Sequence, residues 1–305
     1  MELIQLNEQT WVLHGGANVG IIAYEGRCLI IDSGIDKDAG RDILKQAKKL
    51  GLTPTALLVT HAHADHFGGA HYLVAQTGLK VYATRVEASV MASPILEPLY
   101  LFGGAQPPRE LQHKFLMAKP SPADVILAGN EHVVDEIPLQ VVSLPGHSLE
   151  QVGVAFGETL FTGDAFLTPE ILDKHRIPFY SDVEVGLTTL NTLKAQTYSF
   201  KHVVAGHGEI YTTAEQANRA INYTIERLEG ILDYVLAALA DGTPCSLAAL
   251  LSAVANAQGA TINTLSQYVL YQTTIQAVIS TLYARSEIYP LFQQNILIWK
   301  RGTKA

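Results

Sequence analysis

The chain has 305 residues, 48% of them hydrophobic, which is enough apolar material for one large domain with an appendage or for two domains. It carries 21 Lys and Arg against 29 Asp and Glu, so its formal net charge is -8. An acidic chain has no general attraction to nucleic-acid phosphates or anionic membranes, and a polyanionic partner would need a local basic patch.

The cysteines and the first residues indicate the cellular compartment of the protein. Cys28 and Cys245 lie far apart in sequence, which argues against a disulfide framework. The start, MELIQLNEQTWVLHGG, lacks the basic residues and apolar run of a secretory signal. The sequence contains no run of about eighteen apolar residues, so we predict no membrane span. We therefore expect a cytoplasmic protein with reduced thiols.

The first two thirds of the chain predict short strands alternating with helices. Strands are expected at 11–13, 19–24, 28–32, 56–60, 81–83, 139–144, 152–156, 160–162 and 202–205. A helix is predicted from Ala39 to Leu50, and it ends at Gly51. This alternation indicates an α/β or layered αββα domain.

Residues 88–124 differ from their surroundings because they are rich in proline and yet not polar. A linker would be polar, so we predict an inserted cap of short helices and turns. Some of its residues are candidates to line a pocket or to meet a substrate anion, although surface charge and packing within the cap explain them more simply. These candidates are Tyr100, Phe102, Phe115, Arg109, His113 and Lys114.

The last third is mainly helical in its pattern. Apolar residues recur at spacings of four and three from Ile221 to Leu239, which predicts an amphipathic helix. Further helices are expected at 246–256 and 265–285, and a terminal hairpin at 288–300. Helices followed by a hairpin resemble a winged-helix module. We therefore divide the chain into a first domain of strands and helices, 1–212, which includes the cap at 88–124, and a helical, winged-helix-like domain, 213–305.

A cluster of metal-ligand residue types directly follows the predicted strand 56–60. It contains His61, His63, Asp65 and His66. Residues two apart in an extended segment point to the same side, so His61 and His63 can reach one ion together. If the chain turns into a helix near Asp65, then Asp65 and His66 can serve a second ion. So many ionisable groups beside a core would be unfavourable without a cation.

Three more candidates follow apolar strands, each directly after a glycine. They are His147 in PGHS, Asp164 in TGDA and His207 in AGHG. Strand ends are where α/β domains place their sites. A lone histidine of this kind is more often structural, so each candidate carries little weight alone. Asp32, in IIDSG, is a further carboxylate at a strand end.

In this order, the motifs HAHADH, PGHS, TGDA and AGHG resemble those of the metallo-β-lactamase superfamily over roughly the first 210 residues. The resemblance implies an αββα sandwich with a two-metal site at one edge of its sheets. The ligands that it implies are His61, His63 and His147 for one ion, Asp65, His66 and His207 for the other, and Asp164 as a bridge. Asp32 would orient a ligand histidine or the nearby loop.

The resemblance also implies a chemistry. Imidazole and carboxylate ligands suit zinc, and iron or manganese is compatible with the same set. Such a dinuclear site would supply a metal-bridging hydroxide near neutral pH for attack on a carbonyl or phosphoryl centre. Its residual positive charge would favour the binding of an anionic small-molecule substrate. Asp65 would carry a proton to the leaving group and is therefore the candidate catalytic residue.

The substrate class is narrowed by what the chain lacks. Similar motifs serve lactonases, thioesterases, β-lactamases and nucleases within the superfamily. The interval between Asp164 and His202 is too short for the inserted domain of one nuclease branch, and the start of the chain disfavours a periplasmic antibiotic hydrolase. We therefore expect a small ester, lactone or thioester. His175, Tyr180 and Asp182 are expected in a loop that faces either the site or the surface.

The alternative is a metal-dependent nuclease or phosphodiesterase whose winged helix contacts nucleic acid. From residue 214 onward six basic residues are balanced by six acidic ones, and the segment 273–284 contains neither Lys nor Arg. Such a region would bind phosphates poorly. We favour a structural or dimerising appendage, with its long helix packed on the catalytic part or on a second subunit.

Overall fold

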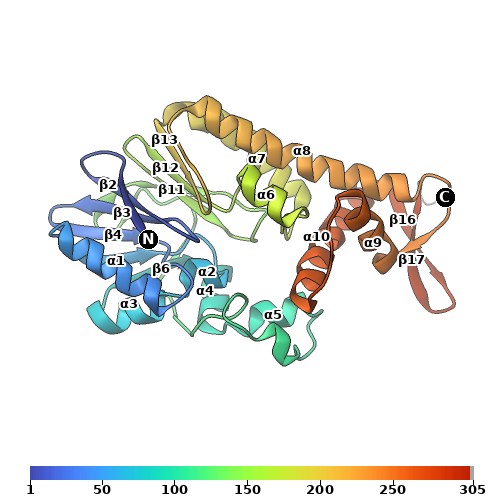
Figure 1. Cartoon of the computed structure of the whole chain (residues 1–305), viewed down its shortest axis with the longest axis horizontal. Helices are drawn as coiled ribbons and strands as arrows, with labels where there is room; N and C mark the ends of the chain where they lie inside the picture. Colours follow the sequence, from blue (N-terminus) through green and yellow to red (C-terminus); the bar gives the residue numbers. More distant parts are fainter. Residues whose placement is uncertain (303–305) are drawn as a thin grey trace.

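The computed structural model describes residues 1–302 and consists of two stacked β-sheets with helices on both outer faces (Figure 1). The larger sheet has seven strands in chain order, and its last four strands run parallel. These strands are β1 (Glu2–Gln5), β2 (Thr10–His14), β3 (Val19–Tyr24), β4 (Arg27–Ile31), β5 (Thr53–Leu58), β6 (Lys80–Thr84) and β7 (Val125–Leu127).

The smaller sheet has five strands and packs face to face on the larger one. Its strands are β10 (Gln140–Ser143), β11 (Val152–Phe156), β12 (Thr159–Gly163), β13 (His202–Ala205) and β14 (Ile210–Tyr211). A short ribbon of β8 (Val133–Val134) and β9 (Ile137–Pro138) precedes it. Ile22 and Leu58 from one sheet and Val154 and Phe161 from the other lie in a common buried cluster. Alternating apolar side chains thus form the core between the two sheets.

Each outer face of the sandwich is covered by helices. The larger sheet is covered by α1 (Lys37–Lys49), α3 (Ala70–Thr77) and α4 (Arg85–Ala92), with Ile43 and Leu73 buried against Leu57. The smaller sheet is covered by α7 (Val183–Gln196) and α8 (Ala214–Ala238). This is the αββα sandwich that the sequence predicts.

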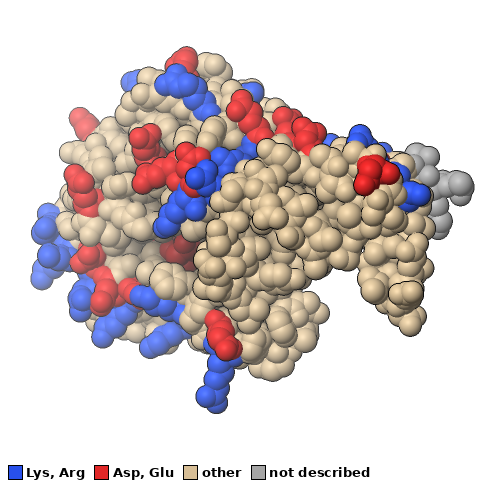
Figure 2. Space-filling model, turned by 45° about the vertical axis from the view of Figure 1, so that its right-hand side comes forward, with Lys and Arg blue, Asp and Glu red and all other residues tan. Residues whose placement is uncertain are grey.

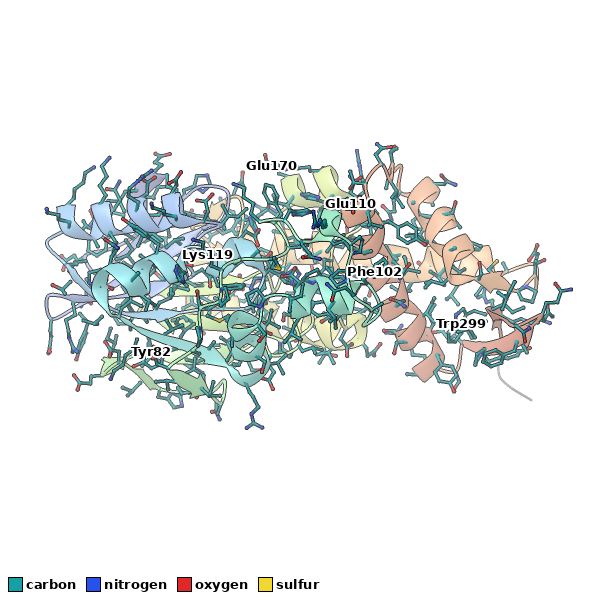
Figure 3. The ribbon with its side chains drawn as sticks, turned by 90° about the horizontal axis from the view of Figure 1, so that it is seen from below. Tyr82, Phe102, Glu110, Lys119, Glu170 and Trp299 are labelled. Atoms are coloured by element: carbon teal, nitrogen blue, oxygen red, sulfur yellow. The ribbon has the colours of Figure 1, made fainter. Side chains whose placement is uncertain are left out.

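The segment 88–124 consists of short helices and turns, as expected. It continues α4 and then forms α5 (Leu96–Leu101) and the 3₁₀ turn η1 (Arg109–Leu111). Leu101, Leu111 and Leu116 are buried against Val269 of α10 (Leu265–Ala284). Figure 3 shows Phe102 of this segment close to the C-terminal helices. The segment therefore joins the C-terminal region to the sandwich.

The C-terminal region is built on α8, which runs from the sandwich to the far end of the molecule (Figure 1). Helix α9 (Leu247–Ala257) and α10 pack beside it. The chain ends in a small sheet of β15 (Cys245–Ser246), β17 (Ile296–Arg301) and β16 (Ile288–Gln293). The hairpin turns at Gln294 and Asn295, whose φ angles of 49° and 63° suit a tight turn. A helical region with a terminal hairpin is thus confirmed.

Several element boundaries differ from those predicted. Strand β5 covers Thr53–Leu58 rather than 56–60, because Val59 and Thr60 already belong to the turn into the histidines. The predicted strand 139–144 is one residue shorter at each end, because β10 covers Gln140–Ser143. Helix α1 begins two residues earlier, because the Asp36 carboxylate accepts hydrogen bonds from the backbone N–H groups of Asp38 and Ala39.

The loop predicted for His175, Tyr180 and Asp182 is confirmed for the last two, whereas His175 ends a helix and much of the remaining interval after Asp164 is helical. This interval contains α6 (Pro169–His175) and the whole of α7, followed by the 3₁₀ turn η2 (Thr197–Ser199). Asp182 is the N-cap residue of α7, where its side chain accepts a hydrogen bond from Val185 N. Tyr180 is fully buried and donates to Ala165 O at 2.8 Å.

None of the helices within residues 1–302 has the length and apolar character that crossing a membrane requires.

Candidate metal centre

The HAHADH motif changes conformation at His63, and this change divides its candidate ligands into two groups. His63 is extended, with φ -77° and ψ 145°, and it precedes the short helix α2 (Ala64–Phe67). His61 and His63 therefore lie on the extended approach, whereas Asp65 and His66 lie on the helix. The two pairs face different points, as their spacing predicts.

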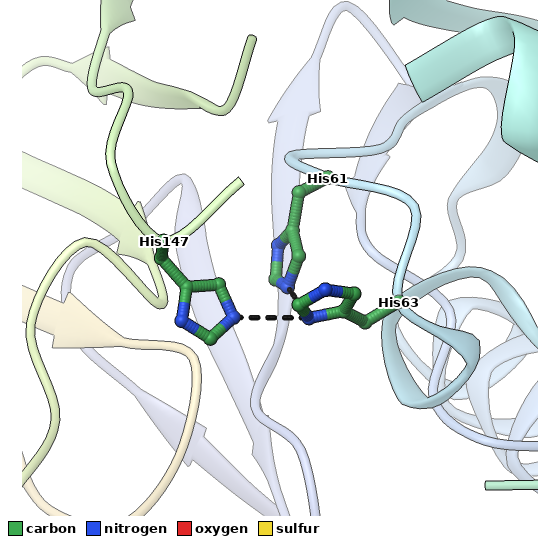
Figure 4. Close-up of side chains that lie close together, drawn as sticks. All are labelled: His61, His63 and His147. Atoms are coloured by element: carbon green, nitrogen blue, oxygen red, sulfur yellow. Dashed lines mark hydrogen bonds between the residues drawn. The ribbon is translucent and has the colours of Figure 1, made fainter. Parts of the chain in front are cut away.

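His61, His63 and His147 converge on one point, and we name them the three-histidine cluster (Figure 4). His63 Nδ1 lies 3.1 Å from His61 Nε2 and 2.9 Å from His147 Nε2. Ligand atoms around a tetrahedral zinc ion, with Zn–N of about 2.0–2.1 Å, lie about 3.3–3.4 Å apart. The three nitrogens are therefore spaced almost as a metal ion would hold them.

The protonation states of the three-histidine cluster favour a cation. Burial lowers the pKa of His61 and of His63 well below the usual range, and neighbouring histidines lower it further. Burial also lowers the pKa of His147. Neutral imidazoles offer free lone pairs, which a metal ion requires.

Asp65, His66 and His207 form a second group, which we name the mixed cluster. His66 Nε2 lies 3.2 Å from His207 Nε2, which in turn lies 3.4 Å from Asp65 Oδ2. Two imidazoles and a carboxylate can together hold a divalent ion.

Asp164 lies between the two clusters. Its Oδ2 is 3.6 Å from His147 Nε2 and 3.4 Å from His207 Nε2, and its Oδ1 is 3.6 Å from His66 Nε2. Oδ1 is buried and has no hydrogen-bond partner among residues 1–302. A buried carboxylate oxygen without a donor fits a position next to a cation.

The groups around Asp164 stabilise one another as ion pairs. Burial would lower the pKa of His66, but Asp164 and Asp32 outweigh it and hold this pKa well above its usual range. Burial also opposes protonation of His207, yet Asp164 raises its pKa to about 9. Burial would raise the pKa of Asp164, but His207 and His66 hold it well below its usual range. A bound cation would replace these protons.

Asp32 holds the imidazole of His66, one of the candidate ligands. Its Oδ2 accepts hydrogen bonds from His66 Nδ1 at 2.8 Å and from Thr60 Oγ1 at 2.9 Å, and its Oδ1 accepts from Thr60 N at 2.7 Å. These bonds hold the proton on Nδ1 and leave Nε2 directed at the mixed cluster. Asp32 adopts a left-handed backbone with φ 61°, a strained conformation that is typical of functional sites.

Glu87 of α4 is a site residue that the sequence did not reveal. Its carboxylate is only 2% exposed, and its Oε2 accepts a hydrogen bond from Ala62 N at 2.8 Å, between two ligand histidines. Its Oε1 accepts from Ser148 Oγ at 2.5 Å and from Glu150 N at 3.2 Å, just beyond His147. One carboxylate therefore connects both segments that carry the three-histidine cluster.

Asn18, in the turn before β3, has a similar role for His207. Its Nδ2 donates to Ala205 O at 2.9 Å and to Gly208 O at 3.1 Å, and its own N–H donates to Gly206 O at 2.7 Å. These bonds fix the turn that presents His207. A single asparagine in a glycine-rich segment offers no sequence signal for such a contact.

The C-terminal helix α10 braces the loop that orients His147. Phe179 O accepts a hydrogen bond from His147 Nδ1 at 2.8 Å. On either side of Phe179, Thr274 Oγ1 donates to Pro178 O at 2.9 Å and accepts from Tyr180 N at 3.3 Å. A residue of the C-terminal region therefore lies one hydrogen bond away from the backbone that positions a ligand.

Two glycines allow close approach around the centre. A Cβ atom on Gly206 would lie 2.0 Å from Asp164 Oδ1, and one on Gly68 would lie 2.0 Å from Ile35 O. The chain passes so close to the ligand carboxylate and to α2 that no larger residue fits.

The candidate residues of the cap segment have different positions. Phe115 lines the cleft above the metal centre and is 62% exposed, whereas Tyr100 and Phe102 are exposed outside this cleft. His113 Nε2 lies 2.9 Å from Ser266 Oγ, and Lys114 pairs with Asp36 at 3.1 Å. Arg109 begins the turn η1. The His113 and Lys114 side chains of the cap thus contribute to packing and to a surface ion pair rather than to the metal centre. Outside the cap, His175 lines the cleft.

The comparisons with known proteins agree with this geometry. The family model described as "Metallo-beta-lactamase superfamily" matches residues 13–213, which is more than half of the chain. The chain belongs to the metallo-β-lactamase superfamily. It is a metallo-hydrolase of that superfamily with a His/Asp metal centre.

Among curated relatives, "Probable metallo-hydrolase YqgX" of Bacillus subtilis is 28% identical over 203 residues, which cover 63% of this chain and 85% of that protein. "Hydroxyacylglutathione hydrolase" of Serratia proteamaculans is 26% identical over 145 residues. That match covers 47% of this chain and 44% of the relative, so less than half of either protein is compared.

Solved structures support the fold over the whole chain. A β-lactamase domain protein from Burkholderia ambifaria has a TM-score of 0.74 at 18% identity, covering 99% of this chain and 94% of that one. A metallo-β-lactamase family protein from Thermus thermophilus has a TM-score of 0.68 at 16% identity, covering 98% of each chain. The C-terminal region is thus part of an arrangement that occurs in other members of this fold.

Proposed function

We propose that the protein hydrolyses a small ester, lactone or thioester with two divalent metal ions. The observation that carries this proposal is the pair of clusters joined by Asp164 on the floor of a cleft of about 700 Å³. The relative named hydroxyacylglutathione hydrolase acts on a thioester by its name, which favours the thioester.

The donor set fits the implied ions. The three-histidine cluster would hold one ion and the mixed cluster the other, with Asp164 between them. Zinc is the expected metal, and iron or manganese suits the same ligands. When bound, such ions lower the pKa of water and polarise a carbonyl oxygen.

The residues of the chain prepare the site for this chemistry. Asp32, the backbone oxygen of Phe179 and the backbone oxygen of Gly16 accept hydrogen bonds from the Nδ1 atoms of His66, His147 and His207. Each of these histidines is thereby held in the tautomer whose Nε2 faces the centre. No ring has to reorient before a substrate is bound.

Asp65 is the candidate for proton transfer. Its side chain is 35% exposed and lines the cleft, whereas Asp164 is almost fully buried. We propose that an Asp65 oxygen receives the proton of the attacking water and passes it to the departing alkoxide or thiolate. Asp65→Asn should therefore slow turnover while the three-histidine cluster still binds metal. A variant with full metal content and full rate would refute this role.

We propose that the C-terminal region is winged-helix-like and that it lines the cleft rather than binding nucleic acid. Helix α10 carries no Lys or Arg, and one of its faces contributes Leu270 and Tyr271 to the cleft. On the face shown in Figure 2, charged side chains are interspersed over the catalytic part and sparse over the C-terminal part. A phosphate backbone would find few cations there.

The first experiment is the metal content of protein purified without added metal or chelator, measured by elemental mass spectrometry. We expect about two equivalents of zinc, iron or manganese per chain, as both clusters require. The protein should then hydrolyse an ester, lactone or thioester in the presence of that ion and lose the activity in a chelator. One equivalent or none, not raised by added metal, would contradict the two-metal proposal.

A further inference from the structure

The cleft above the metal centre has the size of a small-molecule site. Its volume is about 700 Å³, within the range of roughly 300–1,000 Å³ that is usual for ligand pockets. Asp65, His147, Asp164 and His207 lie on its floor. A ligand that fills the cleft therefore reaches both metal clusters.

The walls of the cleft are mainly apolar and come from separate parts of the chain. The segment between β12 and α7 contributes one wall, α10 a second, and residues between Gly34 and Asp42 a third, while the cap segment contributes Phe115. The apolar side chains that matter for the argument are Leu167, Ile177, Phe179, Phe115, Leu270 and Tyr271. A ligand in contact with them would exchange water for hydrocarbon.

Two of the polar side chains that line the cleft are already paired. The Tyr271 hydroxyl donates to His175 O, so the tyrosine presents its ring to the cleft, and the residue is only 7% exposed. At the rim, the Arg41 guanidinium pairs with Asp38 at 2.9 Å. Lys174 is exposed at the mouth and also borders a neighbouring groove. Above the metal ligands, the cleft offers mostly hydrocarbon.

We propose that the acyl part of the substrate is an apolar chain of medium length, bound between the cap segment and α10. This inference rests on the proposed esterase or thioesterase function. In the reaction, the oxygen of water bonds to the acyl carbon and the acyl–O or acyl–S bond breaks. The leaving group takes up a proton, and the products are a fatty acid and an alcohol or thiol.

Binding of the acid product tests the proposal without catalysis. Acetate, hexanoate, octanoate and decanoate are titrated calorimetrically into the metal-loaded protein and into the metal-free protein. Each buried methylene contributes about 0.8 kcal/mol, a factor of about four, so octanoate should bind on the order of tenfold more tightly than hexanoate. The rise should occur in both forms of the protein, because the wall does not depend on the ions. Equal affinity for acetate and decanoate would overturn the proposal.

Two matched variants locate the binding site. Leu270→Asp introduces a carboxylate into the α10 wall and should weaken decanoate binding more than tenfold while acetate binding is unchanged. Leu297→Asp, at a position that is 43% exposed in the distant hairpin, should leave both unchanged. If both variants bind decanoate like the wild-type protein, the chain does not lie against α10 and the proposal is wrong.

Rates separate this inference from the proposed function. Acetyl, octanoyl and polar hydroxyacyl thioesters with the same thiol are compared on the zinc-loaded protein. We expect kcat/KM to be at least tenfold higher for the octanoyl substrate. Hydrolysis of all three with a preference for the polar acyl group would overturn the apolar-chain proposal and leave the hydrolase in place. If none of the thioesters, esters and lactones is hydrolysed, the proposed function fails. The calorimetric titrations then still test whether the cleft binds an apolar chain.

Discussion

The Glu87→Gln substitution should weaken metal binding far more than it weakens the fold. Glu87 accepts three hydrogen bonds, from Ala62 N, Ser148 Oγ and Glu150 N. A glutamine keeps one acceptor oxygen, which can face Ala62 N, while its amide nitrogen can donate to the rotatable Ser148 hydroxyl. The Glu150 N–H then faces an amide donor and loses its partner.

The effect on stability should be modest because two contributions oppose each other. A buried donor without a partner destabilises the fold by about 1–3 kcal/mol. However, burial raises the pKa of the Glu87 carboxyl, so its ionisation destabilises the fold increasingly as the pH rises above the unfolded value. Glutamine removes that contribution. We therefore expect the free energy of unfolding at pH 7 to fall by no more than about 3 kcal/mol.

The effect on metal affinity should be larger. Ala62 lies between His61 and His63, and Ser148 follows His147, so Glu87 holds both segments of the three-histidine cluster in register. Loss of a contact that orients ligands commonly lowers metal affinity about 10–100-fold. Zinc affinity is measured by competition with a chromophoric chelator at pH 7.5, in parallel with chemical unfolding.

The matched control is Glu226→Gln, on an exposed position of α8, which should alter neither quantity. Ser148→Ala removes one of the three bonds and should weaken zinc binding less than Glu87→Gln. A folded Glu87→Gln protein that binds two zinc ions with wild-type affinity would refute the role of Glu87. A loss of affinity that merely follows the unfolded fraction would refute it equally.

The metal centre and the thiols allow three further predictions. Asp164 raises the pKa of His207 to about 9, so His207 stabilises the metal-free fold fully below its unfolded pKa of about 6.5 and loses this contribution as the pH rises through about 9. Zinc binding at pH 7 should therefore release protons. The calorimetric binding enthalpy should then change with the ionisation enthalpy of the buffer. An enthalpy that is the same in all buffers would contradict a protonated His207. Gly206→Ala would place a Cβ 2.0 Å from Asp164 Oδ1, and we expect it to lose one metal equivalent in elemental analysis; two retained equivalents would show that the turn can move. Burial raises the pKa of Cys28 to about 12, while Cys245 is half-buried, so a maleimide should label one thiol in the native protein and two after denaturation. Native labelling of both would mean that the core opens readily.

The parts of the site that the sequence predicts are those fixed by local spacing. His61 and His63 share a side because they are two apart on extended backbone, and Asp65 and His66 turn away because α2 begins after His63. The stripe that becomes α8 and the turn at Gln294–Asn295 are equally local. In each case a period or a turn residue within a few positions determines the geometry.

The parts that the sequence does not predict depend on contacts between distant positions. Glu87 bonds to Ala62 and Ser148, which are 25 and 61 positions away, and Asn18 bonds to Ala205 at a separation of 187. Such pairs arise only after the layers have packed. Helix α7 was overlooked for a related reason, since its inward face becomes apparent only when the smaller sheet is in place.

The recognisable motifs end at His207, but the site they build extends into the C-terminal region. Leu187 and Leu190 of α7 share one buried cluster with Ile221 and Leu228 of α8, so the covering of the smaller sheet is continuous with the C-terminal helices. On α10, Thr274 braces the loop that orients His147.

One turn earlier on the same helix, Leu270 and Tyr271 line the cleft. Because residues three or four apart on a helix lie on one face, a single face of α10 both supports a metal ligand and contacts whatever fills the cleft. The wall that would select the acyl chain and the ligand that would hold the metal are therefore positioned by the same rigid element.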